Sequence, residues 1–440
     1  MRYKKMTNPT DGINQTNKQL STVEDQLCCI NDNLITGVPI AAGPQLDSFG
    51  RLRVSEPLTL FDSSHRFDDN DSWSTATATG GTAVFNANQG LVDLNVTAAS
   101  GSSVVRETIK TFSYQPGKSL LVLNTFVMSS AKAGLTQRIG YYGSQNGFYL
   151  EQVGTTVQFV KRSLVTGSVV NTPVTQADWN GDKLDGTGPS KLILDLTKAQ
   201  ILWMDLEWLG VGSVRIGFVI NGQFIVCHTF HHANLITSTY ITTASLPLRY
   251  EIFNTAGTSG ASTLKQVCST VISEGGYQLK GAQQSIGTSI LSPRTFAVAG
   301  TYYPIVALKL QPTRLDAIVI ITAISLLGIG NGKNYAWRVV NYDVSVSGGL
   351  WVNAPGDSSV QYNLTGTSAT GGRVIASGYI NSSNQASPAL NILKEALFAN
   401  QLERNGLSGV PFEFVLEVAV GTTSGGEGVY ASIDWEEISR

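Results

Sequence analysis

The sequence contains little charge, and this scarcity narrows the choice of partners. Lys, Arg, Asp and Glu make up 14% of the 440 residues, where roughly 25% is typical of soluble domains. The formal net charge is −2, and the one basic run is short, residues 2–5. Nucleic-acid-binding proteins carry a basic patch that faces phosphates. We therefore expect no nucleic-acid partner.

Long apolar runs are also missing. The longest nearly continuous one, residues 317–327, is far shorter than the about 20 residues that a membrane-spanning helix needs. The basic start of the chain is not followed by an apolar segment, so we expect no secretory signal. Membrane insertion is therefore not expected.

Cysteine is scarce and follows no repeated spacing. Its four positions are Cys28, Cys29, Cys227 and Cys268, and a bond between the adjacent pair would be severely strained. We expect reduced thiols, which fits assembly in a cytoplasm. Nucleotide-binding and nucleophile-elbow motifs do not occur in a credible context, so no cofactor is predicted.

A heptad pattern is the sharpest local feature that the chain does have. Apolar residues recur at the spacing of a coiled coil, namely Ile13, Leu20, Val23, Leu27, Ile30 and Leu34. A single helix of three heptads is marginal in water and needs a partner. We predict that residues 1–37 form an oligomerisation or anchoring helix, preferably in a homotrimer, with docking onto another domain as the alternative.

The rest of the chain predicts mainly β structure. Turn-forming residues predict an extended arm over residues 38–80. Period-two patterns separated by Gly and Asn turns then predict a jelly-roll sandwich over residues 81–277. Its strands include residues 191–196, 214–220 and 223–230, and Asn221-Gly222 predicts a tight hairpin.

A second β-sandwich is predicted over residues 281–440. Its strands include residues 303–310, 317–326 and 429–438. It also has one predicted covering helix, which begins after Ser387-Pro388 and ends at Gly406.

Two carboxylates in the stretch WMDLEWLG raise the possibility of glycan hydrolysis. Alternation in a strand places Trp203, Asp205 and Glu207 on one face. Retaining glycosidases need two carboxyl groups about 5 Å apart, but the Glu-x-Asp-x-x-Glu pattern of jelly-roll enzymes fails here at two of its three acids. We predict a solvent face and no catalytic residue, with hydrolysis as the alternative.

Two further groups of residues suggest metal sites. His228, His231 and His232 are close in sequence, but strand geometry turns them to opposite faces. Asp178, Asn180 and Asp182 are spaced like calcium ligands, but the required Gly and Glu are absent. We predict structural hydrogen bonding for the histidines, an Asx-rich turn for the loop, and no metal.

Aromatic residues expected at the surface offer a different kind of site. Trp73, Tyr141, Tyr142 and Trp179 are candidates for stacking on glycans or for filling seams between subunits.

Three blocks of the sequence resemble segments of virion structural proteins of tailed bacteriophages. They are GPQLDSFGRLRVSEPLTLFDSSHRF, WMDLEWLGVGSVRIGFVINGQFIVCHTFHHAN and LPLRYEI, all within residues 43–277. The resemblance implies a particle component with a concanavalin-like sandwich and brings no catalytic residues.

We therefore predict a non-enzymatic structural protein of a tailed-phage virion, assembled in the host cytoplasm. It would occupy the tail, baseplate or a fibre and contact itself and other virion proteins. The alternatives are a head fibre or capsid decoration protein and a module that binds host-surface carbohydrate.

Overall fold

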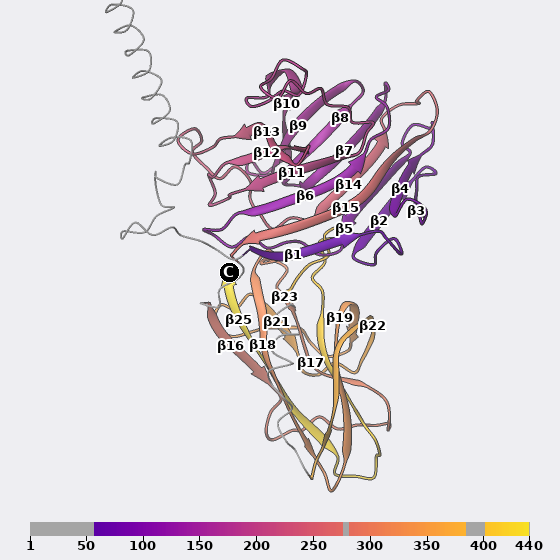
Figure 1. The fold of residues 1–440 in the computed structure, drawn as a ribbon. Coiled ribbons are helices and arrows are strands. Elements are labelled where there is room, and N and C mark those ends of the chain that lie inside the picture. The colour runs from indigo at the N-terminus through magenta and orange to yellow at the C-terminus, as the bar shows by residue number, and fades with distance from the viewer. Residues whose placement is uncertain (1–56, 276–280, 384–400, 440) are drawn as a thin grey trace, which may run out of the picture. The chain divides into compact units, whose positions relative to one another are not determined.

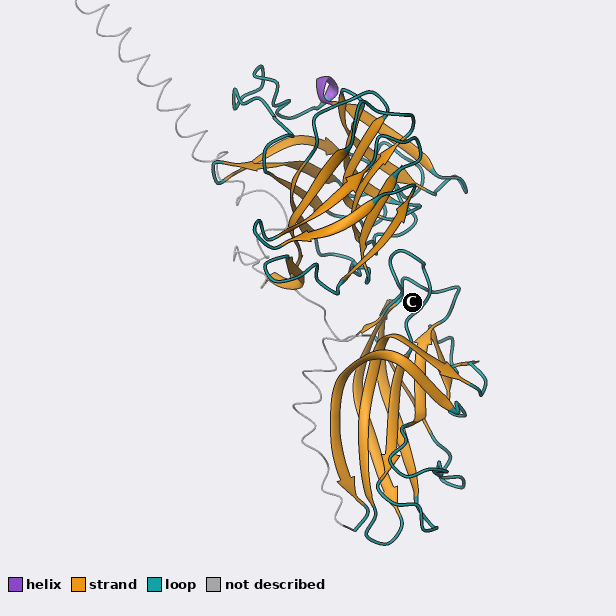
Figure 2. Cartoon of the chain, turned by 90° about the vertical axis from the view of Figure 1, so that its right-hand side faces the viewer, coloured by secondary structure: helices purple, strands orange, loops and turns teal. Residues whose placement is uncertain are grey.

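The computed structural model describes residues 57–275, 281–383 and 401–439. These residues belong to one compact unit that begins at Pro57. They form almost only antiparallel β structure (Figures 1 and 2), which confirms the mainly β part of the predicted fold class. The one helical segment among them is the 3-10 turn η1 (Gln176–Asp178). None of the described helical structure is long and apolar enough to cross a membrane. The predicted heptad helix lies outside the described residues.

The first sandwich consists of two antiparallel sheets that face each other (Figure 1). The eight-stranded sheet has the order β13 (Gln223–Phe230), β12 (Val214–Ile220), β11 (Gln200–Leu206), β6 (Leu120–Val127), β15 (Ser262–Glu274), β4 (Leu91–Val96) and β3 (Thr82–Asn86), with β1 (Pro57–Ser64) paired to β15. The seven-stranded sheet has the order β10 (Val170–Thr175), β9 (Thr156–Ser163), β8 (Gly147–Val153), β7 (Leu135–Tyr142), β14 (Leu248–Asn254), β5 (Ser103–Thr108) and β2 (Trp73–Ala78).

Alternating side chains build the core between these sheets. In β6 every second residue is buried, as a strand with one face on a core requires. Leu94 and Val122 from the eight-stranded sheet, and Ile139 and Ile252 from the seven-stranded sheet, are fully buried in one cluster. The turn between β12 and β13 has positive φ at both Asn221 and Gly222, which confirms the predicted hairpin.

The second sandwich pairs a smaller sheet with a larger one that contains the long strands β19 (Asn334–Ser347) and β22 (Ser368–Asn381). Its four-stranded sheet has the order β16 (Ala282–Gly287), β25 (Gly428–Ser439), β18 (Ile318–Ile329) and β23 (Gln401–Leu402). Its six-stranded sheet has the order β20 (Val352–Asn353), β21 (Val360–Asn363), β17 (Tyr303–Leu310), β24 (Phe414–Val420), β19 and β22.

Several predicted boundaries differ from the structure. The arm predicted over residues 38–80 already contains β1 and β2, because Phe61 and Trp73 bury their rings in the first core. Residues 191–196 form an isolated bridge through Ile193 instead of a strand. The predicted covering helix does not reach Gly406, because Gln401 and Leu402 pair with β18 and a loop follows. Residues 384–400 lie outside the described chain.

Candidate functional site

The structure buries the four aromatic side chains that were expected at the surface. Trp73, Tyr141, Tyr142 and Trp179 are 6%, 1%, 0% and 2% exposed. The expectation of exposed rings is wrong, because three of the rings pack in the core of the first sandwich and Tyr142 is covered by side chains on its outer face. Trp179 stacks on Phe159 at 4.3 Å between ring centroids, and the Tyr141 hydroxyl donates to the backbone oxygen of Phe112 at 2.8 Å.

Tyr142 belongs to a dense set of polar side chains on the outer face of the seven-stranded sheet. Its ring lies 4.4 Å from that of Tyr149, and arginine guanidinium groups cover both rings. We call this set the arginine cluster; it comprises Arg138, Arg162, Arg249, Glu107, Glu151, Glu251, Tyr142 and Tyr149.

The arginine cluster pairs most of its charged groups internally, although Oε1 of Glu107 and Nε of Arg249 have no hydrogen-bond partner among the described residues. Arg138 donates from Nε to Glu151 at 2.6 Å and from Nη1 to Glu251 at 3.4 Å. Arg249 donates to Glu107 at 2.9 Å. Burial raises the pKa of Glu107 to about 7, although Arg249 acts in the opposite direction. With its charges paired internally, this face offers few free groups to a ligand.

The two acids of the WMDLEWLG stretch do not form a pair. Asp205 accepts a hydrogen bond from Nε of Arg215 at 3.0 Å. Strand β11 ends at Leu206, so Glu207 has left the regular face and is exposed. The neighbouring Met204 and Leu206 are buried in the core, as the alternation predicts.

The histidines and the Asp-rich loop have structural partners. His228, His231 and His232 contact Asn180, Ser213 and Gly212 through Nδ1 at 3.3, 3.2 and 2.7 Å. Asp182 accepts from the backbone amides of Leu184 and Ser190 at 2.9 and 2.7 Å, which makes the loop an Asx-type turn. Within the described ranges, no group of three or more His, Cys, Asp or Glu side chains is placed to hold a metal ion.

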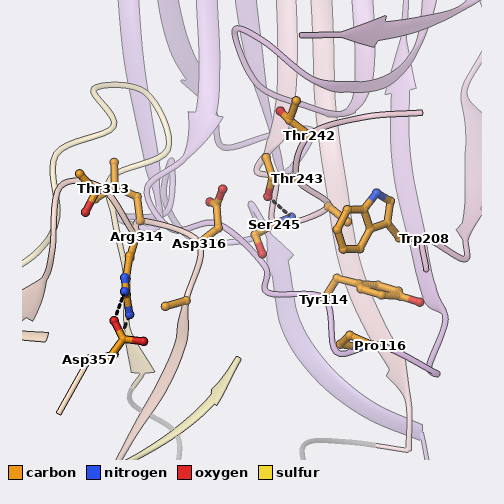
Figure 3. A pocket seen from close by; sticks show the side chains of 13 residues that line it. Tyr114, Pro116, Trp208, Thr242, Thr243, Ser245, Thr313, Arg314, Asp316 and Asp357 are labelled. Carbon is orange, nitrogen blue, oxygen red and sulfur yellow. Dashed lines mark hydrogen bonds and ion pairs between the residues drawn. The ribbon is translucent and has the colours of Figure 1, made fainter. Parts of the chain in front are cut away.

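A pocket of about 470 Å³ provides the candidate site (Figure 3). Its lining comes from three loops of the first sandwich and two of the second: Tyr114, Pro116, Trp208, residues 242–245, residues 313–317 and Asp357. The volume lies in the range of small-molecule sites.

One wall of the pocket is aromatic. Tyr114 and Trp208 meet edge to face, with ring centroids 6.0 Å apart and an interplanar angle of 83°. The indole Nε1 of Trp208 donates to the backbone oxygen of Ile241 at 3.3 Å. Because this bond fixes the indole, Trp208 offers a preset apolar surface to a ligand.

The opposite wall is ionic, and hydroxyl groups connect the two walls (Figure 3). Arg314 donates from Nη1 to the backbone oxygen of Asp357 at 2.6 Å and pairs with its carboxylate. Asp316 accepts from Nε and Nη2 of Arg404 at 3.2 and 3.1 Å. Thr242 and Thr243 line the space between. The pocket therefore joins an apolar face to fixed donors and acceptors.

Sequence reasoning missed most of this pocket. Trp208 was in the stretch considered for catalysis, but only as a residue of the opposite strand face. Arg314, Asp316 and Asp357 lie in turns with no chemical motif. The sequence signal that could have located the ionic wall is the turn-forming stretch Pro355-Gly356-Asp357. Gly356 and Asp357 both adopt positive φ there.

Comparison with known proteins adds a description of similar folds. No protein-family model matches the chain, and no curated protein matches it. Similar solved structures include a legume lectin-like domain from Entamoeba histolytica, with 9% identity, a TM-score of 0.30, and coverage of 50% of this chain and 99% of that one. Another is the Emp47p carbohydrate recognition domain, with 12% identity, a TM-score of 0.32, and coverage of 50% and 97%. A third is the Bacteroides ovatus mixed-linkage glucan GH16 protein, with 11% identity, a TM-score of 0.34, and coverage of 48% and 99%.

Proposed function

We propose that this protein binds carbohydrate without cleaving it, and that the ligand occupies the pocket between Trp208 and Arg314. The observation that carries the proposal is the pairing of an aromatic wall with a polar wall. A sugar ring has an apolar face of C–H groups, which suits an indole, and a rim of hydroxyls, which suits fixed charged groups and hydroxyls.

The charge of the lining favours a neutral polyhydroxyl ligand over a phosphate. Arg314 contributes one positive charge, and Asp316 and Asp357 contribute two negative charges. The guanidinium groups of Arg314 and Arg404 are already hydrogen-bonded to these acids. A phosphate would meet no unpaired cation here, whereas hydroxyl groups can bridge paired charges.

The pairing of the pocket's acids with arginines also favours carbohydrate binding over glycoside hydrolysis. Glycoside hydrolysis needs one carboxyl group that gives a proton to the leaving oxygen. In this pocket each carboxylate accepts hydrogen bonds from an arginine, so neither is free for that role.

A glycan array followed by titration tests the proposal. We expect Trp208→Ala to weaken binding of the selected glycan about tenfold or more, or about 1.4 kcal/mol. Trp351→Ala is the matched control, because Trp351 is half-buried in the second sandwich and does not line the pocket. Absence of binding, or equal affinity of the Trp208 variant and wild type, contradicts the proposal.

A structural role in a tailed-phage particle is the second candidate. It is supported by the sequence resemblance in residues 43–277. Locating the chain in images of assembled particles tests this role, and its absence from them contradicts it. The two candidates are compatible, since a particle protein can also recognise a glycan.

A further inference from the structure

A loop of the second sandwich is inserted against the first, next to the candidate pocket. We call residues 403–412 the clasp loop. The backbone amide of Gly406 donates to the oxygen of Ile109 at 2.7 Å, and Lys110 and Asn405 form an isolated antiparallel bridge. The loop is also tied internally, because the amides of Leu407 and Ser408 donate to Oδ1 of Asn405 at 3.0 and 2.9 Å.

The fit of the clasp loop leaves no room at Gly406. A Cβ atom at this position would lie 2.5 Å from the backbone oxygen of Thr108 and 3.0 Å from Oε1 of Glu107. Arg404 continues the contact on the pocket side, where it donates to the backbone oxygen of Ser245 at 3.3 Å and to Asp316. Through Arg404 the clasp loop therefore positions Ser245 and Asp316, two residues that line the pocket.

Two buried carboxyl groups lie in this contact with unsatisfied oxygens. Oε1 of Glu107 and Oε2 of Glu403 have no hydrogen-bond partner among the described residues. Their side chains are 0% and 9% exposed. An unpartnered buried oxygen is tolerated far better on a neutral carboxyl group than on a carboxylate.

We propose that the clasp loop is a pH-dependent latch on the candidate pocket, seated when Glu107 and Glu403 carry protons and released when both ionise. Release withdraws Arg404 from Asp316 and Ser245 and loosens that side of the pocket. The consequence for ligand binding rests on the proposed carbohydrate function, whereas the movement of the loop does not.

The groups around the two acids set the direction of the response. Glu107 faces Arg249 and Glu251 on β14 and Arg404 on the clasp loop. Glu403 faces Lys110 at 4.0 Å and Tyr342 on β19. Burial raises the pKa of Glu107 from 4.5 to about 7, and it raises the pKa of Glu403 in spite of Lys110. Because the folded values are raised, the seated state is favoured below the ordinary pKa of 4.5 and loses stability as the pH rises through about 7.

Hydrogen–deuterium exchange of the full chain at about pH 5 and about pH 8 tests the latch, with each rate corrected for intrinsic exchange at that pH. The amide of Gly406 reports on the seated loop, because it donates to the oxygen of Ile109 on the first sandwich. We expect its protection to fall roughly tenfold or more at the higher pH. The amides of Asn405, Gly409 and Phe412 donate within the loop and report on its internal structure. The amides of β24 serve as the internal standard for a folded second sandwich.

Four variants give the experiment its controls. Glu107→Gln and Glu403→Gln keep a neutral group of similar size and should each reduce the fall in protection. Gly406→Ala should expose the loop at both pH values. Glu413→Gln removes a carboxylate that pairs instead with Lys309 at 3.5 Å, and it should respond like wild type.

The outcomes separate the latch from the proposed function. Equal protection of the wild-type loop at both pH values overturns the latch, as does an unchanged response in both glutamine variants. If one variant does not fold, as shown by β24 exchange, the other variant and Gly406→Ala decide. A normal loop response without glycan binding at either pH overturns the carbohydrate proposal alone.

Discussion

The two sandwiches differ in how they hold charge. The first carries the arginine cluster on its seven-stranded sheet and contains all four histidines of the chain. The second has a small apolar cluster on its six-stranded sheet, formed by Ala307, Val340, Val344 and Val415, and ion pairs of Arg338 with Glu417 and of Lys309 with Glu413. We therefore expect the stability of the first sandwich to depend more on pH and on intact polar networks than the stability of the second sandwich does.

They are alike in how they close, because each pairs its first strand with its last. In the first sandwich β1 pairs with β15, so that Leu58 lies opposite Ser273. In the second, β16 pairs with β25, so that Ala282 lies opposite Glu437. Each fold closes only when its two ends meet, which makes each sensitive to changes at its start.

Removing the first two strands should have the largest effect. A chain that begins at Gly81 lacks Phe61 and Trp73, which pack in the first core. We expect it to lose the unfolding transition of the first sandwich in calorimetry and to keep that of the second. A chain that begins at Pro57 is the control and should keep both. An intact first transition in the shorter chain would show that β1 and β2 are dispensable.

Breaking one buried charge network in each sandwich sharpens the comparison. Arg138→Gln leaves Glu151 and Glu251 without their guanidinium and should destabilise the first sandwich by about 3 kcal/mol. Arg338→Gln leaves Glu417 alone, but Arg338 is 33% exposed, so we expect about 1 kcal/mol there. Urea denaturation measures both. Equal losses would contradict the view that the first sandwich depends more on its charges.

Acid should weaken the first sandwich through its histidines. Burial lowers the pKa of His65 and of His232 to about 4, from an ordinary 6.5. Because the folded values are depressed, this stability is complete above pH 6.5 and is lost as the pH falls toward about 4. We expect a loss of about 3 kcal/mol for each of the two histidines once the pH is below about 4.

This titration is measured by denaturation in a Glu107→Gln background, because Glu107 contributes with the opposite sign in the same range. His65→Gln and His232→Gln should flatten the curve. His231→Gln, at an exposed position, should leave it unchanged. An equal acid response of the second sandwich, which has no histidine, would point to carboxyl groups instead.

The smallest expected effect concerns turns, where the two sandwiches should behave alike. Gly222 has φ of +75° and Gly425 has φ of +97°, and nothing lies within 4 Å of a Cβ atom at either position. Changing either glycine to alanine should cost about 1 kcal/mol from backbone strain alone. Thermal unfolding measures the loss. A much larger cost at one turn would reveal a contact that the open space does not suggest.

Prediction from sequence worked where the signal is local. Strands β12, β13 and β17 have the predicted bounds, because alternation over one strand and an Asn-Gly turn need no distant partner. Prediction from sequence failed for side chains whose packing partners lie far away in the sequence. Trp73 and Tyr142 are predicted to be available for ligands, yet Phe61 packs against Trp73, and Arg162, Arg249 and Glu251 contact Tyr142. The anchoring residues from Ile13 to Leu34 stay a prediction.

Antiparallel strands in two sandwiches are predictable from the amino-acid sequence, because hydrophobic periodicity and turn chemistry depend on neighbouring residues. The folded structure is needed to establish which strands are neighbours, which aromatic rings are buried, and which loops form the pocket of Trp208, Arg314 and Asp357. This is because burial and electrostatic environment depend on segments more than 200 residues apart, as in the pairing of β1 with β15.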